Sequence, residues 1–235
     1  TVLLSSWLDE LGVSYDLQTY YRRSGWLEAV GRGAFRRPGD EVTWQGGAYG
    51  LQAQANLPIH AGAMTALSVS GLAHYLRLRE TVWLFSLPQI RLPAWFINHD
   101  WGVPIQHVGT SFLPEGIGLM THEEKTFSIT VSAPERAMLE CLYLAPARLD
   151  LVECYQVMEG LTTLRPKLLQ PLLEQCGSIK VKRLFLYMAE KAGQDWLKDL
   201  DTSKFDLGAG ARTVTKGGVY VSRYGLTVPE ELVKL

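Results

Sequence analysis

Residues 11–40 read LGVSYDLQTYYRRSGWLEAVGRGAFRRPGD and carry five arginines but no lysine. Gly12 ends a first helix, which a stripe of apolar residues at helical spacing indicates. Ser14 is a typical N-cap for a second helix, which begins at Tyr15 and ends by Gly25. Two short extended runs then surround a Gly-x-Gly turn, which is the pattern of a β-hairpin. Helix, glycine turn, helix and hairpin, in this order, predict a winged helix-turn-helix.

Helical geometry divides the second helix of this motif into two faces. With Leu17 placed toward the core, three residues fall within about 60° of it: Tyr20, Tyr21 and Ser24. The opposite side of the helix carries Tyr15, Gln18, Thr19, Arg22 and, at its margin, Arg23. We expect Gln18, Thr19 and Arg22 to contact base edges, because their side chains match the donors and acceptors of the major groove. We expect the remaining two residues to bind phosphates.

The hairpin offers a second set of contacts to nucleic acid. Arg32 stands at its tip between two glycines, where an arginine can enter a minor groove. Arg36 and Arg37 on the return strand are expected to bind phosphates. Five arginines against Asp16 and Glu28 give residues 12–37 a local charge of +3, although the whole chain has a net charge of -1. Positive charge is therefore concentrated where a DNA-binding motif requires it.

The composition is that of an ordinary globular chain, with 235 residues, 47% hydrophobic and 20% charged. No apolar run approaches the roughly 18 residues of a membrane span, and no secretory signal is visible. The cysteines Cys141, Cys154 and Cys176 are too widely spaced for a disulfide framework or a metal site. These features lead us to expect a cytoplasmic protein without membrane contact.

The chain is expected to have three regions. Residues 1–40 form the winged helix, 41–80 a helical connector, and 81–235 a C-terminal domain that mixes strands and helices. In the last region, four strand-like runs (81–86, 105–108, 117–120 and 126–131) precede helix starts at Ser132, Asp150, Pro166 and Ser178, and a glycine-rich tail has short β-like runs. Ser132 and Glu135 have the spacing of a capping box. The predicted fold class is α+β, an N-terminal winged helix-turn-helix followed by a mixed α/β domain.

Motifs for catalysis or metal binding are weak. His99, Asp100 and His107 lack the spacing of metal ligands. Ser70 lies in SVSGL, which lacks the leading glycine of a nucleophile elbow. The short GRG turn lacks the Lys-Ser/Thr of a phosphate-binding loop. We expect no cofactor, no metal and no catalytic residue.

The sequence resembles a known family in six blocks that span nearly the whole chain. The N-terminal blocks are GWLEAVGRGAFRRPGD (25–40), TWQGGAYGLQ (43–52) and LPIHAGAMTALSVSGLAHYL (57–76). The C-terminal blocks are VSAPERAMLE (131–140), VMEGLTTLRPKLLQPLLEQC (157–176) and SIKVKRLFLYMAEKAGQDWLKDLD (178–201). They resemble the AbiEi-type antitoxins of type IV toxin–antitoxin systems.

The resemblance implies a bacterial, cytoplasmic repressor that is associated with phage resistance. Its winged helix would bind inverted repeats in its own promoter, and its C-terminal domain would counter a cognate nucleotidyltransferase toxin, for which a stable complex is not required. Winged helices of this group have a further helix before the one that follows Ser5. The chain starts at Thr1 and not at Met, so we expect that this first helix has been trimmed.

A second basic cluster lies in the C-terminal half and faces only Glu174 and Glu190: Arg165, Lys167, Lys180, Lys182, Arg183 and Lys191. Lys182 and Arg183 are predicted to lie off the apolar face of the helix that follows Ser178. We hypothesise that Lys180, Lys182 and Arg183 meet RNA, a nucleotide or more DNA and carry part of the antitoxic effect. The alternative is a solvated polar face.

Two other functions stay open. A ligand-responsive winged-helix regulator would have no toxin partner, and the gene next to its own would distinguish it. A nuclease would need clustered carboxylates around Mg²⁺, and Glu135 and Glu140 with Lys180 and Lys182 show no convincing spacing for one. Such an enzyme would degrade DNA on addition of Mg²⁺, whereas a repressor would only bind it.

Overall fold

The computed structural model describes residues 1–73 and 81–235, which form two compact units. The first unit comprises the described parts of Thr1–Ala61, Glu80–Gly109 and Thr121–Thr130. The second comprises those of Gly62–Arg79, Thr110–Met120 and Val131–Leu235. Residues 74–80, the end of the expected helical connector, lie outside the described residues.

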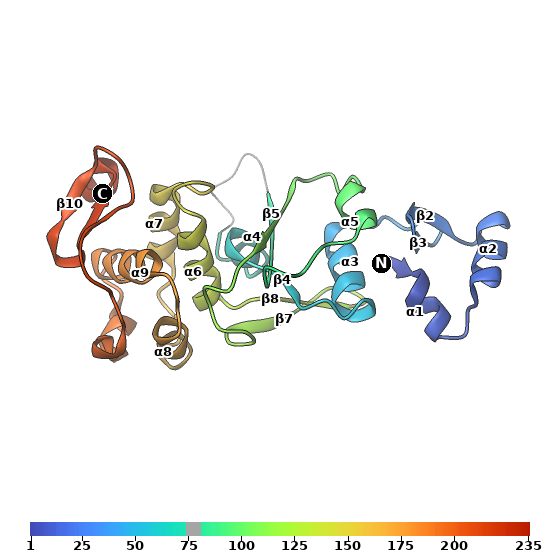
Figure 1. The fold of residues 1–235 in the computed structure, drawn as a ribbon, viewed down its shortest axis with the longest axis horizontal. Coiled ribbons are helices and arrows are strands. Elements are labelled where there is room, and N and C mark those ends of the chain that lie inside the picture. The colour runs from blue at the N-terminus through green and yellow to red at the C-terminus, as the bar shows by residue number, and fades with distance from the viewer. Residues whose placement is uncertain (74–80) are drawn as a thin grey trace. The chain divides into compact units, whose positions relative to one another are not determined.

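The N-terminal part of the first unit is a winged helix-turn-helix (Figure 1). Its elements are β1 (Leu3–Leu4), α1 (Ser5–Glu10), α2 (Tyr15–Arg23), β2 (Glu28–Gly31) and β3 (Ala34–Arg36). The strands form an antiparallel sheet in the order β1-β3-β2. Gly12, at φ +88°, makes the left-handed turn between the helices that other residues rarely adopt. Leu8, Leu27 and Phe35 form the core of this motif, and the predicted fold is confirmed.

A short helical segment follows the winged helix and leads into a second sheet. It consists of α3 (Trp44–Tyr49) and the π-helix η1 (Gly50–Gln54). The five-stranded sheet has the order β6-β5-β4-β8-β7. Its strands are β4 (Ile59–Ala61), β5 (Val82–Ser86), β6 (Ile105–Gly109), β7 (Leu119–Glu123) and β8 (Ser128–Ser132). Helix α5 (Ala94–Asn98) lies between β5 and β6 in the chain.

Strand β4 departs from the mostly helical pattern that was expected after residue 40. It comprises only three residues, in a stretch whose apolar pattern suits a helix as well as a strand. β4 pairs antiparallel with β5, and β5 pairs parallel with β6. The pairing partner, distant in sequence, decides the conformation of this short segment. The other strands of the sheet were all indicated by the sequence.

The second unit is a helical bundle around α6 (Pro134–Leu144), which contacts α4 (Ala63–Val69), α7 (Leu151–Gly160), α8 (Pro166–Glu174) and α9 (Ile179–Lys191). Ala137, Met138 and Leu142 on α6 are fully buried. The predicted starts of α7 and α9 are confirmed, because Asp150 and Ser178 cap them with their side chains. Pro171 lies inside α8 without dividing it.

The capping box predicted at Ser132 and Glu135 is wrong. The N-cap of α6 is Ala133, and it makes no side-chain cap. Ser132 Oγ instead donates to Glu140 Oε2 over 2.8 Å, and Glu135 accepts from Arg165 Nε over 2.9 Å. Burial alone would raise the pKa of Glu135, but the hydrogen bonds and charge of Arg165 outweigh it and lower that pKa. Glu140 and Arg165 therefore take both side chains away from the helix end.

The predicted β-like runs of the tail form a small sheet. Its order is β10-β11-β9, from β9 (Arg212–Thr213), β10 (Val219–Val221) and β11 (Leu226–Val228). Short helical turns accompany it: η2 (Asp195–Asp199), η3 (Thr202–Lys204), η4 (Ser222–Tyr224) and α10 (Glu230–Lys234). Leu226, Val228 and Leu232 of this tail are fully buried.

Candidate nucleic-acid interface

The inner face of α2 differs from the prediction at Gln18, which is only 2% exposed. Its Nε2 donates to Ser5 O over 3.0 Å and to Val13 O over 2.8 Å, and its Oε1 accepts from Ser5 Oγ. The expectation that Gln18 contacts a base is therefore wrong. Gln18 holds α2 against the start of α1 and the turn between the helices. The partners of Gln18 lie five and thirteen residues away in the chain, outside α2. Helical geometry within α2 alone therefore predicted that the amide would face solvent.

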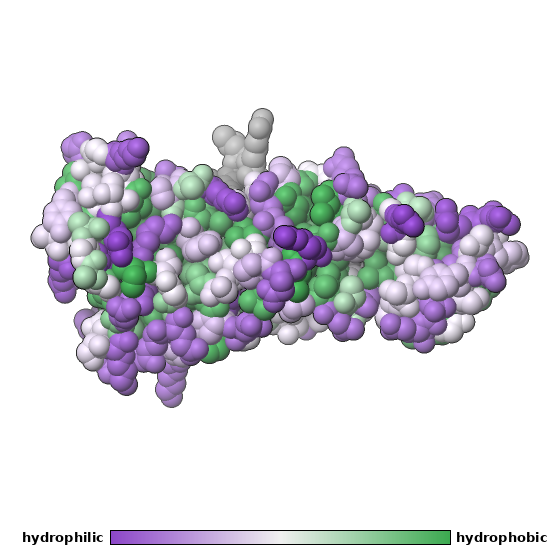
Figure 2. All heavy atoms as spheres, in the orientation of Figure 1, coloured by the Kyte–Doolittle hydropathy of each residue, from purple (hydrophilic) through white to green (hydrophobic). Residues whose placement is uncertain are grey.

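The outer face of α2 carries the remaining predicted contacts. Tyr15 is 58% exposed, and Thr19, Arg22 and Arg23 are exposed as well. Tyr20 and Tyr21 were both predicted near the core; Tyr20 is 62% exposed, whereas Tyr21 packs against the core as predicted. In Figure 2, the winged helix shows a mainly hydrophilic surface where Figure 1 places α1 and α2.

An open groove of about 440 Å³ runs between α2 and β2. It is lined by Thr19, Arg22, Arg23, Leu27 and Ala29. The Arg22 guanidinium lies 5.8 Å from the centre of the Phe35 ring, and this cation–π contact orients the arginine side chain. Two arginines and a threonine thus share one concave surface, with a positive charge suited to a phosphate backbone or a guanine edge.

The wing separates its three arginines into different environments. Arg32 is exposed on the two-residue turn, which Gly33 closes at φ +78°. Arg37 is exposed beyond the end of β3. Arg36 Nε lies 3.0 Å from Glu28 Oε2 on the neighbouring strand, so its charge is already paired. The structure therefore leaves Arg32 and Arg37 as the free cations among the three.

This difference predicts unequal salt dependence of DNA binding. Arg37→Ala should reduce the slope of log K against log salt by about one, because one fewer counterion is released. The double variant Arg36→Ala/Glu28→Ala removes a neutral pair and should leave that slope nearly unchanged. Fluorescence anisotropy with a labelled duplex over a salt series measures both slopes. If the double variant reduces the slope as much as Arg37→Ala does, Arg36 leaves Glu28 to contact DNA.

The part of the second basic cluster to which the hypothesis assigned the antitoxic effect, Lys180, Lys182 and Arg183, is not an exposed surface. Arg183 is 5% exposed and Lys182 is 3% exposed. The Arg183 guanidinium donates to four carbonyl oxygens of the tail, those of Leu207, Gly208, Gly210 and Gly225, over 2.7–3.2 Å. Arg183 therefore holds the tail and does not face a ligand.

Lys180 also has a structural role. Its Nζ donates to Tyr143 O over 2.9 Å and to Ala145 O over 2.5 Å, at the C-terminal end of α6. Burial lowers the pKa of Lys180. A cation at this position satisfies carbonyls that the helix leaves without donors. The hypothesis of a basic antitoxin surface at Lys180, Lys182 and Arg183 is thus wrong in its geometry.

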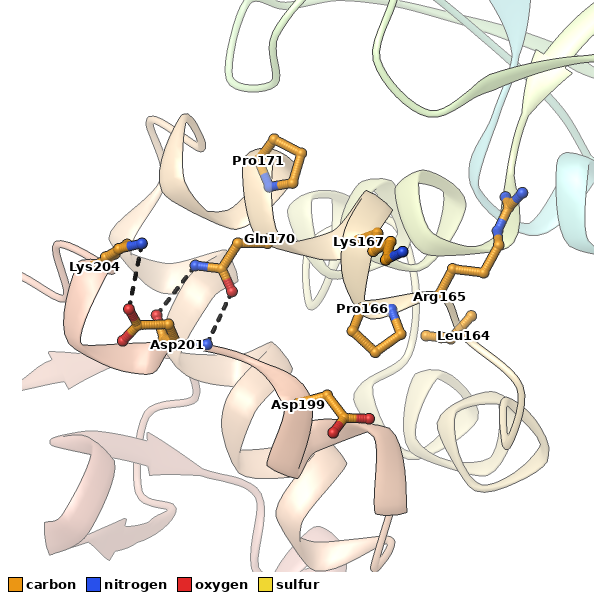
Figure 3. A pocket seen from close by; sticks show the side chains of 9 residues that line it. All are labelled: Leu164, Arg165, Pro166, Lys167, Gln170, Pro171, Asp199, Asp201 and Lys204. Atoms are coloured by element: carbon orange, nitrogen blue, oxygen red, sulfur yellow. Dashed lines mark hydrogen bonds and ion pairs between the residues drawn. The ribbon is translucent and has the colours of Figure 1, made fainter.

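The exposed part of the second cluster borders an open pocket of about 890 Å³ (Figure 3). Arg165 and Lys167 contribute from the start of α8, and Asp199, Asp201 and Lys204 from the η2–η3 segment. Three of these five charged residues are already paired. Arg165 pairs with Glu135, which does not line the pocket, and Lys204 pairs with Asp201 over 3.4 Å. The backbone of Asp201 also binds the Gln170 amide, so the wall of the pocket is held internally. The two other charged residues of the pocket are Lys167 and Asp199, so neither sign of charge dominates.

The histidines set aside in the sequence have structural partners. His107 Nε2 lies 2.8 Å from Ser86 Oγ on the neighbouring strand, and the His99 ring packs edge-on against Trp101. Burial, with a smaller effect of Arg91, lowers the pKa of His107. Within 1–73 and 81–235, no group of three or more His, Cys, Asp or Glu is placed to hold a metal. No helix in these ranges is long and apolar enough to cross a membrane.

Family comparisons cover both parts of the chain. Residues 1–78 match the family described as transcriptional regulator, AbiEi antitoxin N-terminal domain. Residues 79–229 match the family described as transcriptional regulator, AbiEi antitoxin, type IV TA system. The chain belongs to the AbiEi antitoxin family. As an AbiEi protein, it is a member of a family of transcriptional regulators and not of a known enzyme class, which implies DNA and a toxin as partners in general terms.

The AbiEi fold seen here is shared with a solved structure. The crystal structure of RV2827C protein from Mycobacterium tuberculosis matches with a TM-score of 0.63 and 14% sequence identity, over 96% of this chain and 85% of that chain. At this identity the likeness shows the fold alone. No curated protein matches this AbiEi chain.

Proposed function

We propose that this AbiEi protein binds inverted repeats in its own promoter, represses the operon and counters a cognate nucleotidyltransferase toxin. The observation that carries the DNA-binding part is the groove between α2 and β2, where Thr19, Arg22 and Arg23 are exposed together. The family membership of the chain supports the regulatory and antitoxin parts.

The proposed binding mode follows from the accessible side chains. Thr19 and Arg22 contact base edges in the major groove, where Arg22 is held over Phe35 and needs little ordering on binding. Tyr15, Arg23 and Arg37 bind phosphates, and Arg32 at the wing tip enters the minor groove. Gln18 contributes indirectly because it fixes α2 on α1.

Replacing Arg22 tests this mode most directly. Arg22→Ala should weaken binding to the protein's own upstream DNA by about 1–3 kcal/mol, because one base contact is lost. The loss on a scrambled duplex should be smaller. Arg23→Ala is the matched control from the same helix turn, and it should weaken both duplexes alike. Anisotropy titrations at two salt concentrations give these affinities, and equal losses for Arg22→Ala on both duplexes would contradict the assigned role of Arg22.

The antitoxin part needs a test in cells. Expression of this chain together with the neighbouring toxin gene should restore growth, and the Arg22→Ala variant expressed from an independent promoter should still protect. Absence of such a gene, or of protection, would instead favour a ligand-responsive regulator. For the nuclease alternative, the structure offers little support: Glu135 and Glu140 are buried and bonded to Arg165 and Arg136. We therefore propose a protein without catalytic activity.

A further inference from the structure

One side chain forms hydrogen bonds with the open edge of the winged-helix sheet. β1 is an edge strand, so its outer N–H and C=O groups have no neighbouring strand. Gln54 Oε1 accepts from Leu4 N over 2.7 Å, and Gln54 Nε2 donates to Val2 O over 2.7 Å. Gln54 is 5% exposed, and both hydrogen bonds are buried. The glutamine amide therefore replaces the peptide group of a missing strand.

A second glutamine of the same π-helix contacts the five-stranded sheet. Gln52 Nε2 donates to Ile59 O over 3.1 Å and to Thr130 O over 3.0 Å, and its Oε1 accepts from Thr130 N over 2.8 Å. Residues two apart on a helix project in nearly opposite directions. The π-helical turn thus holds β1 on one side and β4 with β8 on the other. Within the first unit, this turn connects the two sheets through hydrogen bonds.

Glycines make the approach of these parts close. A Cβ on Gly46 would lie 3.4 Å from Thr1 Cα, and a Cβ on Gly50 would lie 3.5 Å from Val2 Cβ. The wing has the same relation to α5, since a Cβ on Gly31 would lie only 2.8 Å from Trp95 Cβ. The motif TWQGGAYGLQ and Gln54 therefore form a junction. Its glycines allow the close approach, and the side-chain amides of Gln52 and Gln54 supply the hydrogen bonds.

We infer that Gln54 is a positioning residue for DNA recognition, and this inference rests on the proposed DNA-binding function. Gln54 fixes β1, and β1 pairs with β3 and leads directly into α1. The first turn of α1 holds α2 through the bonds of Ser5 with Gln18. Loss of the Gln54 bonds would loosen this chain of contacts and the orientation of Arg22 relative to the wing. No charge and no DNA-contacting side chain would be lost.

The test compares Gln54→Ala with Gln52→Ala in the full chain. Both variants remove side-chain amide hydrogen bonds from the same turn and should lower the melting temperature. Only Gln54→Ala should reduce the ratio of affinities for upstream and scrambled duplex, by about tenfold. Anisotropy is measured at a temperature at which circular dichroism shows both variants folded. If Gln54→Ala does not fold, Gln54→Met retains most of the side-chain volume without the hydrogen bonds and takes its place.

Amide hydrogen exchange gives the second readout. Leu4 and the α1–α2 segment should exchange faster in Gln54→Ala, whereas Gln52→Ala should leave them at the wild-type rate. An unchanged affinity ratio in Gln54→Ala, or an equal fall in both variants, would overturn the inference. A wild type that does not prefer upstream DNA would instead overturn the proposed function, and the exchange rates would still show whether Gln54 holds the winged helix.

Discussion

Replacement of Arg183 by alanine should lower the free energy of unfolding by about 3–5 kcal/mol and release the C-terminal tail, because four carbonyls of the tail would lose a charged donor that is itself buried. For a chain of this size the melting temperature should fall by about 6–20 °C. Thermal denaturation followed by circular dichroism measures the first effect. Limited proteolysis, with cleavage mapped between Asp206 and Val228, measures the second.

Two controls separate geometry from charge in this prediction. Arg183→Lys keeps the cation but not the planar fork that reaches several carbonyls at once, so its loss should be intermediate. Arg212→Ala removes an exposed cation from the same tail and should change stability by less than about 0.5 kcal/mol. A fully stable Arg183→Ala variant with a protease-resistant tail would contradict the structural role. Because Arg183 is bonded to the tail, a loss of toxin protection in the Arg183→Ala variant would indicate a disordered tail and not a lost contact surface.

Glu140→Ala should have an effect of similar size in the helical bundle. Glu140 is fully buried, and it accepts from Ala63 N over 2.9 Å, Ser132 Oγ over 2.8 Å and Arg136 Nε over 2.9 Å. Its removal leaves the Arg136 guanidinium buried without its carboxylate, which costs about 3–5 kcal/mol. Urea denaturation should show a lower midpoint with an unchanged m-value.

A double variant distinguishes the pair from its surroundings. Glu140→Leu/Arg136→Met replaces both charges with apolar side chains, and it should recover much of the stability that the single variant loses. Glu140→Gln keeps an acceptor for Ala63 N and should fall between wild type and Glu140→Ala. A Glu140→Ala variant within about 1 kcal/mol of wild type would show that the bundle does not depend on this carboxylate.

The short-range signals in the sequence were sufficient for the winged helix. Gly12, Ser14 and Gly33 each mark a turn or cap within a few residues, so helix boundaries and the hairpin follow from local geometry. Most strands and helices of the C-terminal half were likewise predictable from periodicity and caps. Strand β4 was not, because three residues carry too little periodic information and pairing with β5 decides their conformation.

The burial of several polar side chains could not be predicted from the sequence. Gln18, Gln54 and Arg183 are polar side chains that the sequence alone would place in water, yet each is buried against backbone groups. The partners of Gln54 lie about fifty residues away in the chain, and those of Arg183 lie 24 to 42 residues away. A long polar side chain on a helix is equally compatible with solvent and with distant carbonyls.

By itself, the sequence determined the order of elements, the concentration of arginines in residues 12–37 and the family. The tertiary structure alone decided which of the polar side chains are free to bind. It left Thr19, Arg22 and Arg23 exposed beside one groove, paired Arg36 with Glu28, and used Gln18 and Arg183 as internal donors. The physical reason is that buried backbone groups need partners, and the fold supplies them from whichever polar side chains it brings near.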